Sequence, residues 1–214
     1  MLKFLTKLIF VAMLVTPYTA SGAGVPDGGV LDFAVLRNGS KIGHHVIRFE
    51  RSGDPMIVRI EAQIDYRLAF IPLYLFQHVS REEWRDGRLV GMVAETNDNG
   101  DDYHIEVKPD GSELSLSING EETPIDPEMV PASLWNIALV KRGSILDPAD
   151  GDLMKVAIRD SGEEVIEVRG QEIRARRYVM TGDFERDLWY DKQSILVQVR
   201  FKGRDGSEIR YSLR

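Results

Sequence analysis

The chain of 214 residues contains no cysteine, which excludes disulfide bonds, thiolate nucleophiles and thiolate metal sites. It also lacks a Gly-x-Ser-x-Gly elbow, a His-Glu-x-x-His helix and a glycine-rich phosphate loop, which are the signatures of several large enzyme classes. With only 4 histidines, a zinc site would need carboxylates for most of its ligands. The sequence therefore predicts no catalytic residues, no metal and no cofactor, and a non-enzymatic protein is the favoured expectation.

A long apolar stretch occurs at the N-terminus, where two lysines precede a run from Leu8 to Val15 and small residues end at Ala23. This order predicts a cleaved secretion signal, so the mature chain would start near Gly24 and work in the periplasm. The alternative is a membrane anchor, but the run ends at Tyr18 after an interruption at Pro17, and a spanning helix needs about 20 apolar residues. We expect no membrane span in the mature chain.

Basic residues are in the minority, with 27 Lys and Arg against 34 Asp and Glu. Without the two lysines of the predicted signal, 25 remain against 34, which gives the mature chain a net charge of −9. This charge opposes nonspecific binding to nucleic acid and to anionic lipid surfaces. Residues 24–214 are enough for one β-rich domain, although two smaller domains remain the alternative.

Short runs of alternating polar and apolar residues are separated by dipeptides that favour tight hairpin turns. These dipeptides are Asn38-Gly39, Asp86-Gly87, Asp110-Gly111, Asn119-Gly120 and Asp205-Gly206. Strands are expected at 31–37, 41–50, 56–69, 73–85, 88–96, 153–160, 164–169, 172–180 and 185–190, and in the hairpins around 110 and 205. One helix is expected at 131–142, where it could fill the concave side. About a dozen strands indicate a mainly β fold, either a large curled antiparallel sheet or a partly open barrel.

The register of two hairpins follows from the rule that opposed residues share a face of the sheet. Around Gly111, a two-residue loop opposes Val107 to Leu114 and makes one face continuously apolar. In the last hairpin a two-residue loop would mix the faces, so a three-residue loop that opposes Phe201 to Ile209 is expected.

The densest group of chemically informative side chains follows one predicted strand, whose alternate residues share a face. These residues are Tyr74, Phe76, His78, Ser80, Glu82 and Trp84. A two-residue loop at Asp86-Gly87 would place His78 opposite Glu95 and Trp84 opposite Leu89. One interpretation is a polar anchor within a ligand cavity, where burial shifts pKa values; the other is an ordinary His–Glu pair on a sheet surface. The predicted ligand-binding residues are Tyr74, Phe76, His78, Glu82, Trp84, Glu95 and Trp189.

Two patterns invite a metal interpretation. Residues 95–100 followed by Glu106 match the spacing of a calcium-binding loop, but strands rather than helices flank them, so an acidic turn is the better interpretation. His44 and His45 are adjacent on a strand and point to opposite faces, so they cannot jointly chelate one ion.

Near the C-terminus, Asp187, Trp189 and Asp191 share one strand face. Paired carboxylates beside an aromatic ring are typical of sugar-cleaving sites. The residues after Asp191 are equally consistent with a turn between two strands.

Several motifs in order carry a family resemblance: His78-x-x-x-Glu82-x-Trp84-x-x-Gly87-x-Leu89, Thr96-Asn97-Asp98-Asn99-Gly100, Trp135-Asn136 and Leu188-Trp189-Tyr190-Asp191. From Leu31 to Leu213 the chain resembles an uncharacterised family of exported bacterial domains of unknown function. The resemblance implies a β-rich periplasmic domain similar to lipoprotein-carrier half-barrels. It supplies no catalytic residues.

Three functions remain open at this stage. The first is a periplasmic carrier that holds a lipid or another apolar or amphipathic small molecule in the concavity of the sheet. The second is an envelope module that binds a protein partner along a sheet edge or patch. The third is a hydrolase in which His78 acts with Glu82 or Glu95. The first is favoured, because exported β domains without catalytic motifs are usually binding proteins. The fold alone does not fix a function.

Overall fold

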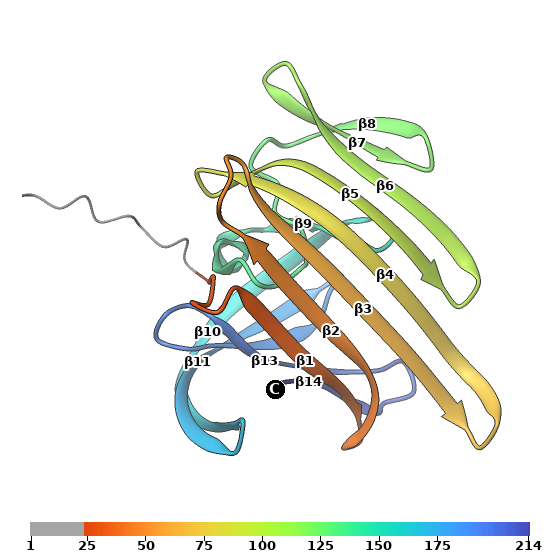
Figure 1. The fold of residues 1–214 in the computed structure, drawn as a ribbon, viewed down its shortest axis with the longest axis vertical. Coiled ribbons are helices and arrows are strands. Elements are labelled where there is room, and N and C mark those ends of the chain that lie inside the picture. The colour runs from red at the N-terminus through yellow and green to blue at the C-terminus, as the bar shows by residue number, and fades with distance from the viewer. Residues whose placement is uncertain (1–23) are drawn as a thin grey trace, which may run out of the picture.

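The computed structural model describes residues 24–214, so the predicted secretion signal lies outside the described residues. The described chain forms a single antiparallel sheet of 14 strands and one short 3-10 turn, η1 (Figure 1). The strands are β1 (Val30–Arg37), β2 (Ser40–Glu50), β3 (Met56–Leu68), β4 (Ile71–Arg85), β5 (Arg88–Asp98), β6 (Asp101–Asp110), β7 (Glu113–Ile118), β8 (Glu121–Ile125), β9 (Ser144–Leu146), β10 (Leu153–Val168), β11 (Gln171–Gly182), β12 (Arg186–Tyr190), β13 (Leu196–Lys202) and β14 (Glu208–Leu213). The expected mainly β architecture is confirmed.

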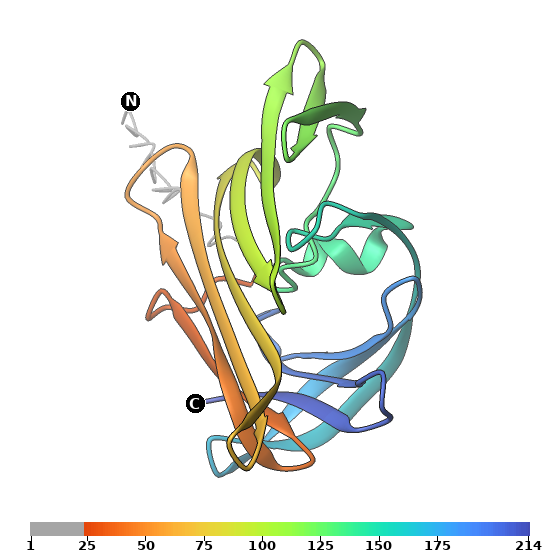
Figure 2. The same cartoon turned by 90° about the vertical axis from the view of Figure 1, so that its right-hand side faces the viewer.

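The sheet consists of two meanders that β1 and β14 join. Its strand order is β8-β7-β6-β5-β4-β3-β2-β1-β14-β13-β12-β11-β10-β9, so β8 and β9 are its two ends and it is not closed. The sheet curls until its first half faces its second half across the inside (Figure 2). In the described residues, no helix has the length and apolar character needed to cross a membrane.

The segment between β8 and β9 runs through the inside of the curl. The prediction of a helix at 131–142 within this segment was wrong. Only η1, at Ile137–Lys141, has helical geometry. Pro131 forms a bridge with Leu146, and Leu134 has a positive φ of 66°, which interrupts a right-handed helix. The apolar spacing reflects burial instead, because Trp135 and Leu139 are both in the core.

The two register predictions had different outcomes. The last hairpin is confirmed, since Phe201 faces Ile209 and the three-residue loop ends at Gly206 with φ of 80°. Around Gly111 the register was wrong by two residues: Val107 faces Leu116, because the turn is Gly111-Ser112 and not Asp110-Gly111. A shift of two preserves the face of each residue, so the apolar face was still identified correctly.

The structure differs from the predicted strands at three places, β8, β9 and β10. The expected strands at 153–160 and 164–169 are one strand, β10, with an irregularity between Asp160 and Glu163. The short strands β8 and β9 were not expected. Both lie at ends of the sheet, where only one neighbour constrains the sequence and alternation is weak.

Candidate functional site

Burial changes steadily along the inner face of β4. Glu82 is 0% exposed and His78 is 5% exposed, whereas Phe76 and Tyr74 are only half-buried. The neighbouring strand β3 shows the same trend and ends at Leu68, which is 63% exposed. The concave side of the sheet is therefore filled at one end and open at the other, and five of the predicted site residues, Trp84 included, lie along this gradient.

At the filled end, Glu82 joins β4 to the segment that runs through the inside. The indole N–H groups of Trp84 and Trp135 both donate to Glu82 Oε2, over 2.8 and 3.1 Å. The two indole rings are also in edge-to-face contact, with centroids 5.1 Å apart. Burial raises the pKa of Glu82, and the two indole N–H groups oppose this rise. Because both side chains are sealed in the core, Glu82 and Trp84 stabilise the fold and do not line an accessible surface.

The last mostly buried row of residues before the open part of the concave side crosses five strands. Phe33 faces His45, His45 faces Ala62, Ala62 faces His78, and His78 faces Thr96. His78 Nδ1 lies 2.8 Å from the Thr96 hydroxyl oxygen. Burial, followed by smaller effects of the nearby His78 and His44, lowers the pKa of His45 to about 3, and burial lowers the pKa of His78 to about 4. Both imidazoles are therefore neutral near pH 7.

Above this row, aromatic side chains from both halves of the sheet cover the inner face. The rings of Tyr74, Phe76 and His78 follow one another along β4, with successive centroids 6.4 and 6.2 Å apart. On the other side, Tyr211 contacts His45 at 5.4 Å and Phe201 at 6.0 Å. We call these six residues the inner ring cluster: His45, Tyr74, Phe76, His78, Phe201 and Tyr211. Burial raises the pKa of both tyrosines, so their hydroxyl groups stay protonated.

Glu95 is not part of this cluster, and its predicted position opposite His78 was wrong. Trp84 does face Leu89 as expected, but the pairing then shifts between Glu83 and Trp84, so β5 has one extra residue. Glu95 consequently faces Val79 on the outer face of the sheet. A one-residue bulge reverses the face of every later residue. The hydrolase interpretation required His78, Glu82 and Glu95 to converge. Because Glu95 lies on the outer face, these three side chains do not converge.

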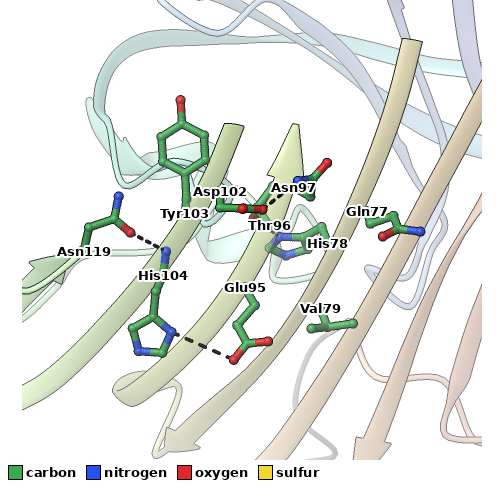
Figure 3. Close-up of a pocket in the computed structure, with 10 residues that line it drawn as sticks. All are labelled: Gln77, His78, Val79, Glu95, Thr96, Asn97, Asp102, Tyr103, His104 and Asn119. Atoms are coloured by element: carbon green, nitrogen blue, oxygen red, sulfur yellow. Dashed lines mark hydrogen bonds and ion pairs between the residues drawn. The ribbon is translucent and has the colours of Figure 1, made fainter. Parts of the chain in front are cut away.

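On the outer face, Glu95 borders a hollow of about 450 Å³ between β4, β5 and β6 (Figure 3). The side chains of this outer hollow are mostly polar and exposed: Gln77, Val79, Glu95, Asn97, Asp102, His104 and Asn119. His104 Nδ1 lies 4.0 Å from a Glu95 carboxylate oxygen. Asn119 completes the rim by pairing with the backbone of His104 through its own N–H and its side-chain carbonyl. The outer hollow is also lined by His78, Thr96 and Tyr103, so His78 borders both this hollow and the inner ring cluster (Figure 3).

Trp189 is also separate from the inner ring cluster. Its indole N–H donates to Glu164, and Arg177 and Arg200 lie over its ring at 5.4 and 5.1 Å. Both guanidinium groups bind the same oxygen of Asp187. The Asp187 carboxylate is therefore engaged in a half-buried ionic network beside the buried Trp189, and we assign Trp189 to packing rather than to ligand contact.

The metal interpretations gain no support from the geometry. Asn99 and Gly100 form the tight turn between β5 and β6, both with positive φ, as a two-residue hairpin loop requires. Asp191 accepts backbone N–H groups of Gln193 and Ile195, which is the turn alternative for that segment. Between residues 24 and 214, no group of three or more His, Asp or Glu side chains is arranged to hold a metal ion.

The sequence did not identify His45, Phe201 and Tyr211 as site residues. They lie on β2, β13 and β14, and Tyr211 comes beside His45 because β2 and β14 both pair with β1 in the sheet. The local signal was limited to alternation: His45 lies on the same face as the apolar Ile47 and Phe49. Alternation gives the face of a residue but not the strand that lies across from it.

Comparison with known proteins supports the fold. A family model described as a domain of unknown function (DUF6134) matches residues 33–214. The crystal structure of a beta-barrel-like protein of the domain of unknown function DUF1849 from Brucella abortus aligns over 86% of this chain and 94% of that chain, with a TM-score of 0.58 and 10% sequence identity. At this identity the likeness concerns the fold alone. No curated protein matches the chain. Because the family model covers most of the sequence, the chain belongs to the DUF6134 family of domains of unknown function.

Proposed function

We propose that this protein binds an apolar or amphipathic ligand on the concave side of its sheet, at the inner ring cluster, and does so in the periplasm after export. The observation that carries the proposal is the burial gradient along β3 and β4. One end of the concave side is closed by the Glu82–Trp84–Trp135 contact, and at the other end the inward-facing aromatic rings stay half-buried.

Half-buried rings that face inward favour a ligand for a physical reason. Removing apolar surface from water stabilises a complex by about 25 cal/mol for each Å², so a chain laid over Phe76 and Tyr211 gains from both. The open end carries further apolar surface, since Phe70 at the β3–β4 turn is 95% exposed. Polar groups of His45 and Tyr211 lie among the rings, which suits a ligand with one polar end.

Binding of a protein partner along a sheet edge receives less support. The end strand β8 carries Glu121, Glu122 and Pro124, and charged residues and proline are features that discourage pairing with another strand. At the other end, β9 has only three residues. We therefore favour a carrier of a small molecule over an edge-binding module.

A matched pair of variants tests the site. Ile64 is half-buried on the inner face between Gly43 and Phe76, whereas its neighbour Gln63 is exposed on the outer face. Ile64→Trp should fill the space above the His45–His78 row, and Gln63→Trp should add the same indole on the opposite face.

The binding probe is the neutral fluorophore N-phenyl-1-naphthylamine, whose emission rises in an apolar site. We expect the wild type and Gln63→Trp to bind it equally and Ile64→Trp to bind it at least about tenfold more weakly, since loss of one well-filled contact surface is worth 1.4 kcal/mol or more. Equal binding by both variants, or no binding by the wild type, would contradict the proposal. Native mass spectrometry of protein isolated from the periplasm would show the natural ligand as an added mass.

A further inference from the structure

One arginine of the concave side is clamped between aromatic rings. Arg186 begins β12, in which Leu188 and Tyr190 on the same face are buried inside the curl. Its guanidinium carbon lies 3.9 Å from the ring centroid of Phe184 and 3.6 Å from that of Phe201. Such contacts hold the plane of a guanidinium group in a fixed orientation. Because Phe201 belongs to the inner ring cluster, Arg186 borders the proposed ligand site directly.

This arginine also has no carboxylate as an ion-pair partner. Among residues 24–214, no Asp or Glu oxygen lies within 4.0 Å of the Arg186 guanidinium, which donates a hydrogen bond to the backbone carbonyl of Glu185 over 2.7 Å. On the outer face, by contrast, Arg177 and Arg200 share the Asp187 carboxylate. Burial lowers the pKa of Arg186, yet an arginine remains charged in a folded protein.

Two acidic residues lie in the same region without neutralising Arg186 by contact. Glu185 interacts with it through its backbone carbonyl, and its side chain is exposed. Asp147 accepts the N–H of Ala149 over 2.9 Å, and burial raises its pKa to about 6. The remaining donor positions of the guanidinium are thus available on the concave side.

We propose that Arg186 binds the anionic head, a carboxylate or a phosphate, of an amphipathic ligand whose apolar chain lies along the inner ring cluster. This inference rests on the proposed function and adds the chemical class of the ligand. The carboxylates of Asp147 and Glu185 act on Arg186 only through space, and a bound anion would add the direct contact that a half-buried charge requires to offset its desolvation. The planar fork of a guanidinium group matches the two oxygens of a carboxylate or phosphate.

The contacts between rings give the direction of the chain. From Arg186 the path passes over Phe201 to Tyr211, with ring centroids 6.0 Å apart, and then to His45 at 5.4 Å. The Tyr211 hydroxyl and the neutral imidazole of His45 can each donate a hydrogen bond to an anionic head or to polar atoms next to it. A head held at Arg186 would therefore direct its chain toward the His45–His78 row.

Competition against N-phenyl-1-naphthylamine tests this inference with four compounds: dodecanoate, dodecyl phosphate, the uncharged dodecyl maltoside, and inorganic phosphate. Below their micelle concentrations, we expect the two anionic amphiphiles to displace the probe from the wild type about 10- to 100-fold more effectively than dodecyl maltoside, the range of a charge-assisted bidentate contact. Inorganic phosphate should not displace the probe.

Arg186→Met should abolish the preference for an anionic head, measured within each protein as the ratio of displacement by the anionic amphiphiles to displacement by dodecyl maltoside, because methionine keeps apolar volume and carries no charge. Arg186→Lys, which keeps the charge and loses the fork, should retain part of the preference. The control is Arg174→Met on β11, an exposed arginine, and it should behave as the wild type. Urea unfolding verifies that each variant is folded.

The outcomes separate the two proposals. If the wild type binds no probe and no amphiphile, the proposed function itself fails. If it binds amphiphiles without preference for an anionic head, or if Arg186→Met and Arg186→Lys both keep the full preference, the proposed function stands and the role of Arg186 is refuted. Displacement by inorganic phosphate equal to that by dodecyl phosphate would refute an amphipathic ligand for this arginine.

Discussion

Replacing Glu82 tests whether this residue holds the filled end of the concave side together. Glu82→Ala removes the acceptor of two indole N–H groups, from Trp84 and Trp135. Each buried donor left without a partner costs about 1–3 kcal/mol, and the cavity left by the deleted side chain adds at least about 1 kcal/mol. The expected loss is therefore about 3–7 kcal/mol, a large part of the 5–15 kcal/mol that typically stabilises a domain. Urea unfolding followed by tryptophan fluorescence measures it directly, because both indoles are in the affected contact.

Glu82→Gln is the matched variant, since it keeps the shape of the side chain and removes its charge. Burial raises the pKa of Glu82 above its ordinary 4.5, so the folded wild type binds a proton more tightly than the unfolded chain does. Its stability is then highest at low pH and falls as the pH rises from 4.5 through the folded-state pKa. The stability of Glu82→Gln relative to the wild type should therefore increase from pH 4.5 to pH 8. The reasoning is refuted if Glu82→Ala costs less than about 1 kcal/mol, or if the relative stability of Glu82→Gln is lower at pH 8 than at pH 4.5.

Three further predictions concern single positions. Burial raises the pKa of Asp147 from 3.8 to about 6, so the contribution of this group to wild-type stability should fall as the pH rises between these values. Asp147→Asn should therefore be more stable than the wild type at pH 8, by on the order of 2–3 kcal/mol, but not at pH 3.5. Thermal unfolding at the two pH values measures the difference. A Cβ on Gly43 would lie 2.0 Å from the backbone oxygen of Gln63, so Gly43→Ala should lower the urea midpoint by an amount equal to about 3 kcal/mol; an unchanged midpoint would contradict the strand pairing. The Tyr190 hydroxyl donates to the Leu134 carbonyl over 2.6 Å, so Tyr190→Phe should cost about 1–3 kcal/mol in urea unfolding, and a loss below the measurement error would count against that contact.

Much of the candidate site could be predicted from alternation along one strand. The expectation that Tyr74, Phe76, His78, Glu82 and Trp84 share a face is confirmed by their common inward position on β4. What alternation could not give was depth. The same face runs from the sealed core to the open end, so the five residues divide between a structural contact and an accessible aromatic surface.

The error at Glu95 has a definite physical origin. The pairing of β4 with β5 shifts by one residue beside Gly91, and all residues after the shift change faces. A glycine inside a strand is a recognised sign of a bulge, so Gly91 marks the shift, which the length of the loop does not reveal. The positions of Phe201, Tyr211 and Arg186 had no such signal, since they depend on the pairing of β1 with β14, which joins segments far apart in the sequence.

The charge of the whole chain and the charge inside the curl act in opposite directions on an anionic ligand. Residues 24–214 carry a net charge of −9, which repels anionic surfaces over a Debye length, about 8–10 Å at physiological ionic strength. Arg186 lies inside the curl between two rings, where solvent screening is weaker and a contact with an anion is stronger. A protein with this distribution would bind single amphiphiles without adhering to an anionic membrane. Raising the salt concentration should consequently speed the entry of an anionic ligand while changing its dissociation rate little, which stopped-flow displacement of the fluorescent probe can measure.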